Sequence, residues 1–320
     1  MDTVYHIPAM LKETIEGLNI KPDGVYVDVT FGGGGHSRAI LERMREFEDL
    51  KIRRFEDSGH LYSFDQDKDA LENAMKGDGL RVTGDGKWTF VLSNFRYLRN
   101  WMDYYGVREI DGLLADLGVS FHHFDCPERG FSFRYPAPLD MRMNQTAKRT
   151  AADIVNTYSE EELAKILYLY GELKNGRQVA HNICAARSKK PIERTEELVA
   201  ASRIPADKSK ELARLFQALR IEVNDELGAL REMLVAARDL LKPGGRIAIL
   251  TYHSLEDRLV KNFLRSGNLD GTIEKDFYGN ILTPFKLIEK GREASEEEVE
   301  RNPRARSAKL RVAIKKEKNI

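Results

Sequence analysis

Residues 25–41 read VYVDVTFGGGGHSRAIL, a strand-like run that breaks into four consecutive glycines and then enters a helix. Glycine has no Cβ, so Gly32–Gly35 allow positive φ angles and a close approach of the backbone to a bound molecule. The following helix would point its free N–H groups and positive dipole end at the same place. The stretch predicts a nucleotide-type cofactor turn, although a glycine-rich turn is also a common way to end a strand.

The acid before these glycines bears on the choice of cofactor. A dinucleotide-binding turn has the order G-x-G-x-x-G, whereas here Asp28 lies at the strand end and the glycines follow without a break. A carboxylate would repel a pyrophosphate but suits the sulfonium and ammonium groups of S-adenosylmethionine. The alternative is a buried acid that caps a loop N–H. We favour the cofactor interpretation.

Composition indicates an ordinary soluble protein. The 320 residues include 51 Lys+Arg and 51 Asp+Glu, so a nucleic-acid site would have to be a local basic patch. Two cysteines, Cys126 and Cys184, make neither a metal cluster nor a disulfide framework, and no metal site is expected. The N-terminus lacks the pattern of a signal peptide, and no apolar run is long enough to span a bilayer. We expect a cytoplasmic protein with no membrane partner.

Strand and helix patterns alternate in the first part of the chain. This alternation predicts an α/β fold with a parallel, doubly wound sheet. Residues 127–220 show only helical spacing, and the alternation resumes with a helix over 225–241 and a strand at RIAILTY, residues 246–252. We therefore expect a core domain at 1–125 and 221–320, with an inserted all-helical substrate-recognition domain at 126–220. The expected strands of the first part are 26–29, 61–64, 90–92 and 112–114.

Polar and aromatic side chains follow these expected strands, where ligands gather in open α/β sheets. Asp65 suits the two hydroxyls of a ribose, with Asp67 better placed to cap the next helix. Phe95 follows Asn94 and suits stacking on adenine, although a core aromatic is the alternative. Asp116 suits either the cofactor or the localisation of an amine lone pair for attack on a methyl group, and the sequence does not separate these roles.

The strand at 246–252 ends in YHSLEDRLVK. Ser254 is a plausible N-cap of the next helix, with Asp257 three residues later. Tyr252 and His253 remain as catalytic candidates, because an aromatic there suits a flipped base and a histidine suits its orientation. A histidine satisfied in the core is an equal alternative for His253.

Arginines and lysines form two local basic segments. Phe131, Phe133 and Tyr135 interleave with the arginines of the first, as in base-stacking platforms. The alternative is that this segment packs the insertion, with its arginines paired to acids. Near the C-terminus, KLRVAIK (309–315) alternates like an edge strand that returns to the sheet. The expected RNA-binding residues are Arg129, Arg134, Arg142, Arg304, Arg306, Lys309 and Arg311.

Seven motifs together resemble the ribosomal RNA small subunit methyltransferase H family, across nearly the whole chain. They are DVTFGGGGHSRAIL, DLGVS, ERGFSFR, LDMRM, FQALRIEVNDEL, KPGGRIAILTYHSLEDRLVK and NPRARSAKLR. The resemblance implies a class I S-adenosylmethionine-dependent methyltransferase fold, a Rossmann-like mixed sheet of seven strands with a helical insertion. It also implies N4-methylation of a cytidine in 16S rRNA, in the decoding centre of the small ribosomal subunit.

The same resemblance implies which residues bind S-adenosylmethionine. Seven residues after the aspartate at position 116 the family has a glutamine, where this chain has His123. An imidazole can still donate or accept one hydrogen bond there. The sequence leaves open the oligomeric state, a homodimer included, and whether the substrate is naked RNA or an assembled subunit. The implied cofactor-binding residues are Gly34, Gly35, His36, Asp65, Phe95, Asp116 and His123.

Two rival functions remain. A nicotinamide-dependent oxidoreductase is disfavoured by the glycine order and Asp28. A non-catalytic RNA-binding or ribosome-assembly factor on a methyltransferase fold is disfavoured by Asp65 and Asp116.

Overall fold

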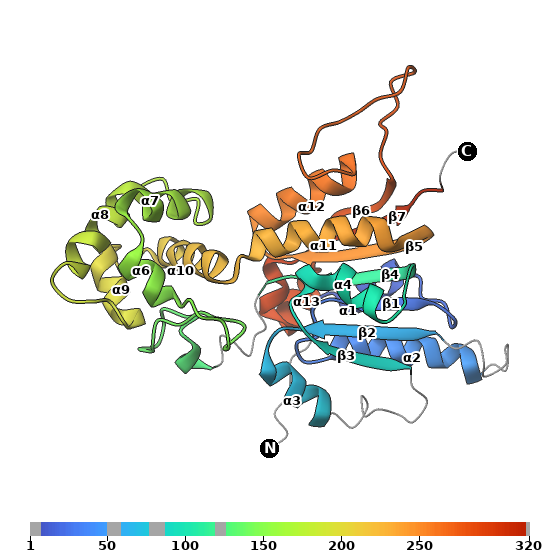
Figure 1. The fold of residues 1–320 in the computed structure, drawn as a ribbon, viewed down its shortest axis with the longest axis horizontal. Helices are drawn as coiled ribbons and strands as arrows, with labels where there is room; N and C mark the ends of the chain where they lie inside the picture. Colours follow the sequence, from blue (N-terminus) through green and yellow to red (C-terminus); the bar gives the residue numbers. More distant parts are fainter. Residues whose placement is uncertain (1–7, 50–58, 77–86, 119–125, 318–320) are drawn as a thin grey trace. The chain divides into compact units, whose positions relative to one another are not determined.

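A computed structural model describes residues 8–49, 59–76, 87–118 and 126–317 (Figure 1). The chain divides into two compact units. The first, which we call the sheet unit, is Met1–Gly118 with Gly228–Ile320, and the second, the helical unit, is Val119–Leu227.

The sheet unit is built on one sheet of seven strands in the order β3-β2-β1-β4-β5-β7-β6. The strands are β1 (Val25–Asp28), β2 (His60–Asp65), β3 (Trp88–Leu92), β4 (Ile110–Asp116), β5 (Leu241–Thr251), β6 (Phe285–Glu293) and β7 (Lys309–Lys315). Strands β1 to β5 pair in parallel, and β7 pairs antiparallel with both β5 and β6. The expected α/β fold with a mixed seven-stranded sheet is confirmed.

Helices cover both faces of this sheet because its strands are apolar on both sides. Val27 and Ile249 face one core, where α4, α11 and α12 pack. Tyr26 and Leu250 face the other, where α1, α2 and α3 pack. The helices of the sheet unit are α1 (Leu11–Leu18), α2 (Gly35–Asp49), α3 (Lys68–Lys76), η2 (Phe95–Tyr97), α4 (Leu98–Tyr104), α12 (Ser254–Ser266), α13 (Glu296–Arg301) and η4 (Pro303–Ser307). Helix α11 (Glu226–Leu240) begins in the last residues of the helical unit, and the rest of it belongs to the sheet unit.

The C-terminal strands correct one expectation and add one strand. KLRVAIK does return to the sheet as β7, but it lies between β5 and β6 and is not an edge strand. Its Leu310 and Val312 are fully buried, as an interior strand requires. The strand at this edge of the sheet is β6, which the sequence pattern did not indicate. Its pairing with β7 shifts register twice, between Leu287 and Glu289 and between Lys290 and Arg292.

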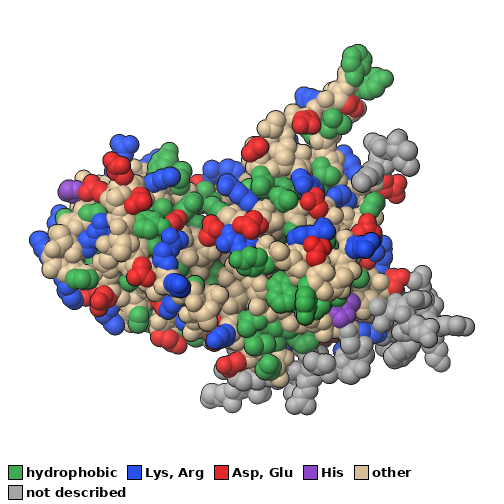
Figure 2. Space-filling model, in the orientation of Figure 1, with side chains coloured by type: hydrophobic (Ala, Val, Ile, Leu, Met, Phe, Trp, Pro, Cys, Tyr) green, Lys and Arg blue, Asp and Glu red, His purple; other side chains and the backbone are tan. Residues whose placement is uncertain are grey.

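Between α12 and β6 a narrow arm leaves the sheet unit (Figure 1). The chain turns back at its end, where Asp276 Oδ1 accepts hydrogen bonds from the Tyr278 and Asn280 N–H groups. Phe277 and Tyr278 are 97% and 86% exposed, and Figure 2 shows hydrophobic side chains at the end of the arm.

The helical unit has its own apolar core. Leu163, Leu167, Ile183, Leu215 and Leu219 are at its centre and are almost completely buried. Its helices are η3 (Pro127–Arg129), α6 (Ala151–Thr157), α7 (Glu160–Leu169), α8 (Gly176–Arg187), α9 (Thr195–Ser202) and α10 (Ser209–Asn224).

Candidate functional site

The glycine turn joins β1 to α2 in the conformation that glycine allows. Gly32 and Gly34 have φ angles of 53° and 77°, in the left-handed region. The Gly34 N–H donates to Phe31 O at 2.7 Å, which closes the turn. A Cβ added to Gly35 would lie 2.6 Å from Pro8 Cγ, so a side chain does not fit there.

Asp28 serves this turn from inside the protein. It is 0% exposed; its Oδ1 accepts from the Thr30 N–H at 3.0 Å and its Oδ2 from Ser37 Oγ at 2.6 Å. Burial raises the pKa of this carboxyl, while the hydrogen bond from Ser37 acts in the opposite direction. Asp28 is therefore the buried loop cap, and the interpretation of this side chain as a contact of the cofactor's positive groups is wrong.

Asp65, at the end of β2, is tied to the turn. Its Oδ2 accepts from the Gly32 N–H and its Oδ1 from the Asp67 N–H, at 2.8 and 2.9 Å. A carboxylate accepts several hydrogen bonds, as the two hydroxyls of a ribose would require. Asp67 accepts from the Asp69 N–H at 3.1 Å in the first turn of α3, as expected for a cap.

Asn94 and Phe95 follow β3. Asn94 caps η2 by accepting from the Arg96 N–H, and its amide donates to Gln66 Oε1 at 2.9 Å. Phe95 is half-buried and packs against the sheet core. Part of the Phe95 ring therefore contributes to the packing of the sheet core.

Asp116 lies at the end of β4 and is held by three neighbours. Tyr252 Oη donates to its Oδ1 at 2.6 Å, its own N–H donates to Thr30 Oγ1 at 2.6 Å, and His36 Nδ1 lies 3.6 Å from its Oδ2. Its side chain is 14% exposed. Burial raises the pKa of Asp116 to about 7; the hydrogen bond from Tyr252 lowers it and the charge of Glu256 raises it. The carboxyl thus changes charge near neutral pH.

Tyr252 and His36 keep fixed protonation states around this carboxyl. Burial, followed by the charge of Asp116, raises the pKa of Tyr252 well above its ordinary value, so the phenol remains a donor. Burial lowers the pKa of His36, against the charge of Asp28. His36 is 4% exposed.

His253 caps α12, and the expected cap at Ser254 is wrong by one residue. His253 Nδ1 accepts from the Glu256 N–H at 3.4 Å, and Glu256 Oε2 accepts from the N–H groups of Tyr252 and His253 at 3.0 and 3.3 Å. His253 Nε2 lies 3.1 Å from Glu256 Oε1. Both ring nitrogens thus face α12, which agrees with a structural role for the histidine.

Sequence reasoning missed two residues that organise this site. Thr30 accepts from the Asp116 N–H, and its Oγ1 lies 3.3 Å from Asp28 Oδ1, so it links β1 to β4. Glu256 is 3% exposed and fixes the backbone of Tyr252. The order His-x-x-Glu at 253–256 has capping-box spacing, the one signal that would have found Glu256.

The site fits the expected S-adenosylmethionine. Among the described residues, no atom lies within 4 Å of a Cβ added to Gly32, so the turn borders open space. Carboxylates at the ends of β2 and β4 supply acceptors for hydroxyl and amine groups, and they stand at the same edge of the sheet because β1 pairs with both strands. The candidate His123 lies outside the described residues.

Two of the expected RNA-binding arginines are occupied within the fold. Arg129 is 8% exposed and donates to Arg142 O and Met143 O. Arg311 is 6% exposed and is paired with Asp257 through Nε and Nη2, at 2.8 and 3.0 Å. These side chains are not placed to meet a phosphate.

Arg142 forms a two-pronged pair with Asp140. Phe131 is buried in the helical core, and Phe133 packs on Phe216 with ring centroids 5.7 Å apart. The packing alternative thus describes these residues, whereas Tyr135 is 52% exposed. The remaining arginines of the two basic segments are exposed: Arg134, Arg304 and Arg306.

No helix in the described part of the chain is long and apolar enough to cross a membrane.

Comparison with known proteins agrees with the resemblance found in the seven motifs. The model of the MraW methylase family matches residues 3–316. A protein of Parabacteroides distasonis, described as ribosomal RNA small subunit methyltransferase H, is 56% identical over 319 residues, covering 98% of each chain. One of Phocaeicola vulgatus with the same description is 54% identical over 321 residues, again covering 98% of each chain.

Among solved structures, an rRNA methylase from Streptococcus thermophilus matches 98% of each chain with a TM-score of 0.41 and 12% identity. A likeness this distant adds no argument about function. The two sequence relatives are more than half identical to this chain almost from end to end. The family model also spans nearly the whole chain. The chain belongs to the MraW methylase family.

Proposed function

We propose that this methylase transfers a methyl group from S-adenosylmethionine to N4 of a cytidine in 16S rRNA, in the decoding centre of the small ribosomal subunit. The relatives described as ribosomal RNA small subunit methyltransferase H support an rRNA substrate. The observation that carries the chemistry is Asp116, a nearly buried carboxyl at the end of β4 whose pKa is raised to about 7.

Asp116 addresses the difficulty of this reaction. The lone pair of an exocyclic amine is delocalised into the ring, so the amine is a poor nucleophile. An ionised Asp116 that accepts an N4–H hydrogen bond would localise that pair and take up the proton released on transfer. The Tyr252 hydroxyl donates a hydrogen bond to Asp116 Oδ1 at 2.6 Å, and the other carboxylate oxygen, Oδ2, would accept from the amine. When bound, S-adenosylmethionine supplies an electrophilic methyl group.

The remaining assignments follow the edge of the sheet. Gly34, Gly35 and His36 hold the cofactor beside the turn, Asp65 accepts from the ribose hydroxyls, and Phe95 contacts the adenine. Tyr252 positions Asp116, and we assign His253 to capping α12 rather than to the reaction. His123 stays a proposal from the family resemblance.

RNA would be held by exposed cations, with Arg134 in the helical unit and Arg304, Arg306 and Lys309 in the sheet unit. We assign substrate recognition to the helical unit, because the sheet unit already contains the proposed cofactor residues and Asp116. The competing possibility is a non-catalytic ribosome-assembly factor.

A methyl-transfer assay decides between these functions. Small subunits from a strain that lacks this methylation, incubated with protein and labelled S-adenosylmethionine, should gain one N4-methylcytidine, identified by mass spectrometry of nucleosides. Asp116→Ala should abolish transfer and keep the fold, as judged by circular dichroism. No transfer by the wild-type protein would favour the assembly factor, and normal turnover in Asp116→Ala would remove the role given to that residue.

A further inference from the structure

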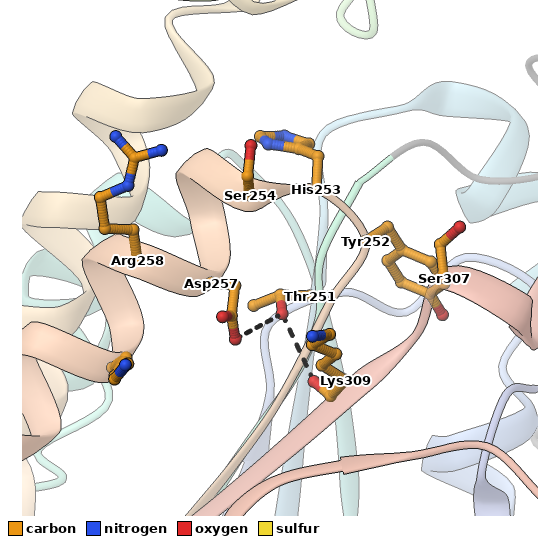
Figure 3. Close-up of a pocket in the computed structure, with 9 residues that line it drawn as sticks. Thr251, Tyr252, His253, Ser254, Asp257, Arg258, Ser307 and Lys309 are labelled. Carbon is orange, nitrogen blue, oxygen red and sulfur yellow. Dashed lines mark hydrogen bonds between the residues drawn. The ribbon is translucent and has the colours of Figure 1, made fainter. Parts of the chain in front are cut away.

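A cavity of about 490 Å³ opens beside the first turn of α12, at the carboxyl end of β5. Figure 3 shows its walls: Tyr252 and Ser307 lie together at one end, and Lys309 lies next to Thr251 and Asp257. Arg258 and Lys261, three residues apart on α12, complete the basic lining. The cavity is built entirely from the sheet unit.

The lining has a positive balance of charge. Among the lining residues, which all belong to the described part of the chain, three are cations and Asp257 is the one carboxylate. Both oxygens of Asp257 accept hydrogen bonds from Arg311, whose side chain is 7% exposed. The buried guanidinium group therefore compensates the negative charge of Asp257. The lining residues themselves therefore carry more positive than negative charge.

The carboxylate of Glu293 lies near this lining. Lys309 Nζ is 3.0 Å from Glu293 Oε1, but these side chains are 43% and 67% exposed. A pair this exposed contributes little and exchanges readily for another anion.

The polar groups of the cavity are suited to phosphate oxygens. Ser254 and Ser307 bring hydroxyl groups, both on exposed residues. Ammonium and guanidinium groups form charge-assisted hydrogen bonds with phosphate, and hydroxyls add neutral ones. The 13-residue helix α12 also starts here and directs its positive end to the same place.

Tyr252 connects this cavity to the reaction site. Its residue lines the cavity, while its hydroxyl donates to Asp116 Oδ1 at 2.6 Å. The two sites are thus separated by a single side chain. A nucleotide whose base reaches Asp116 would bring a phosphate of its own backbone to the cavity.

We propose that this cavity is a phosphate subsite, which binds a phosphodiester next to the cytidine that enters the reaction site. This inference rests on the proposed function for the identity of the RNA. The subsite fixes the position of the backbone, while Asp116 and Tyr252 act on the base.

The test measures binding, without turnover. The probe is a short RNA with the target cytidine, prepared with normal phosphodiesters and with each one next to the cytidine replaced by a neutral methylphosphonate. The proteins are the wild type, Lys261→Ala and the control Arg265→Ala, which removes an exposed cation one turn further along α12 and outside the cavity lining. Affinity is measured by fluorescence anisotropy over a range of salt concentrations, with S-adenosylhomocysteine present.

We expect Lys261→Ala to weaken binding about 3- to 10-fold and to reduce the slope of log affinity against log salt by about 0.7, the value for one single-strand phosphate contact. One methylphosphonate should weaken wild-type binding similarly and have little further effect in Lys261→Ala. Arg265→Ala should behave as the wild type. Wild-type protein that fails to bind the RNA, or equal losses in the two variants, would overturn the subsite. Binding as expected without methyl transfer would overturn only the proposed function.

Discussion

At the scale of single residues, the surroundings of Asp116 suit it to the proposed chemistry. An ordinary aspartate is fully ionised at neutral pH, whereas burial raises the pKa of this one to about 7. Thr30 and His36, from the two ends of the glycine turn, and Tyr252, from the end of β5, surround it. A carboxyl with this pKa and this fixed geometry is able to exchange a proton under the conditions in which the protein works.

The raised pKa predicts how stability depends on pH. A folded-state pKa above the unfolded value means that the folded protein binds more protons between pH 4 and pH 7, so stability from this group falls as pH rises through that window. The difference of about three units corresponds to at most about 4 kcal/mol. Asp116→Asn should gain stability relative to the wild type as pH rises from 4 to 8.

Urea denaturation at several pH values measures this difference. Asp103→Asn serves as the control, because Asp103 is 54% exposed and forms a surface pair with Arg99. Its difference from the wild type should change little over the same range. A difference for Asp116→Asn that stays constant with pH would show that Asp116 titrates normally.

At the scale of elements, α12 and β7 are locked by a partly buried ion pair. Asp257 lies in the first turn of α12, and Arg311 lies in β7 behind it, with two hydrogen bonds between them. The pair also sets the charge of the cavity, since it neutralises the one acid in the described lining. Arg311, which sequence reasoning assigned to RNA, therefore positions secondary structure.

Removal of one partner should be costly. Asp257→Ala leaves the Arg311 guanidinium buried without its carboxylate, and the expected loss is about 3 kcal/mol of unfolding free energy. The double variant Asp257→Leu with Arg311→Met removes both charges and should recover most of that loss. Thermal unfolding compares the two. Equal destabilisation of the single and double variants would show that the charge pair is not the cause.

At the scale of the whole molecule, the chain forms two units with separate cores. The sheet unit is made of two segments, since β5 and β7 complete a sheet that β1 to β4 begin. All the described residues assigned to the cofactor and to the reaction belong to it. The helical unit has its own core and is assigned to substrate recognition.

Deletion of the helical unit tests this division. Replacing Val119–Leu227 by a flexible glycine-serine linker should leave a folded sheet unit that binds S-adenosylmethionine within a few-fold of the full chain, as measured by calorimetry. Methyl transfer to small subunits should be lost. A matched point variant, Arg134→Ala in the full chain, should weaken RNA binding with no effect on cofactor binding. Full transfer by the shortened protein would remove the recognition role from the helical unit.

The sequence by itself determined the α/β class, the first five strands, the glycine turn and the family. Those features depend on local patterns: apolar runs of strand length, glycines where φ is positive, and motifs in a fixed order. S-adenosylmethionine agrees with the family, but Asp28 is a buried loop cap and does not face the positive groups of a cofactor, because burial is not visible in a local sequence.

Only the tertiary structure decided which charges serve function and which serve the fold. Asp28, Arg129 and Arg311 looked like ligand contacts, yet each is buried and bonded within the fold, Asp28 to Ser37, Arg129 to Met143 O and Arg311 to Asp257. The pKa of Asp116 depends on Tyr252, 136 residues further along the chain, and the position of β7 inside the sheet and the cavity beside α12 likewise join segments that are separate in the sequence. Residue type and spacing do not encode such proximity.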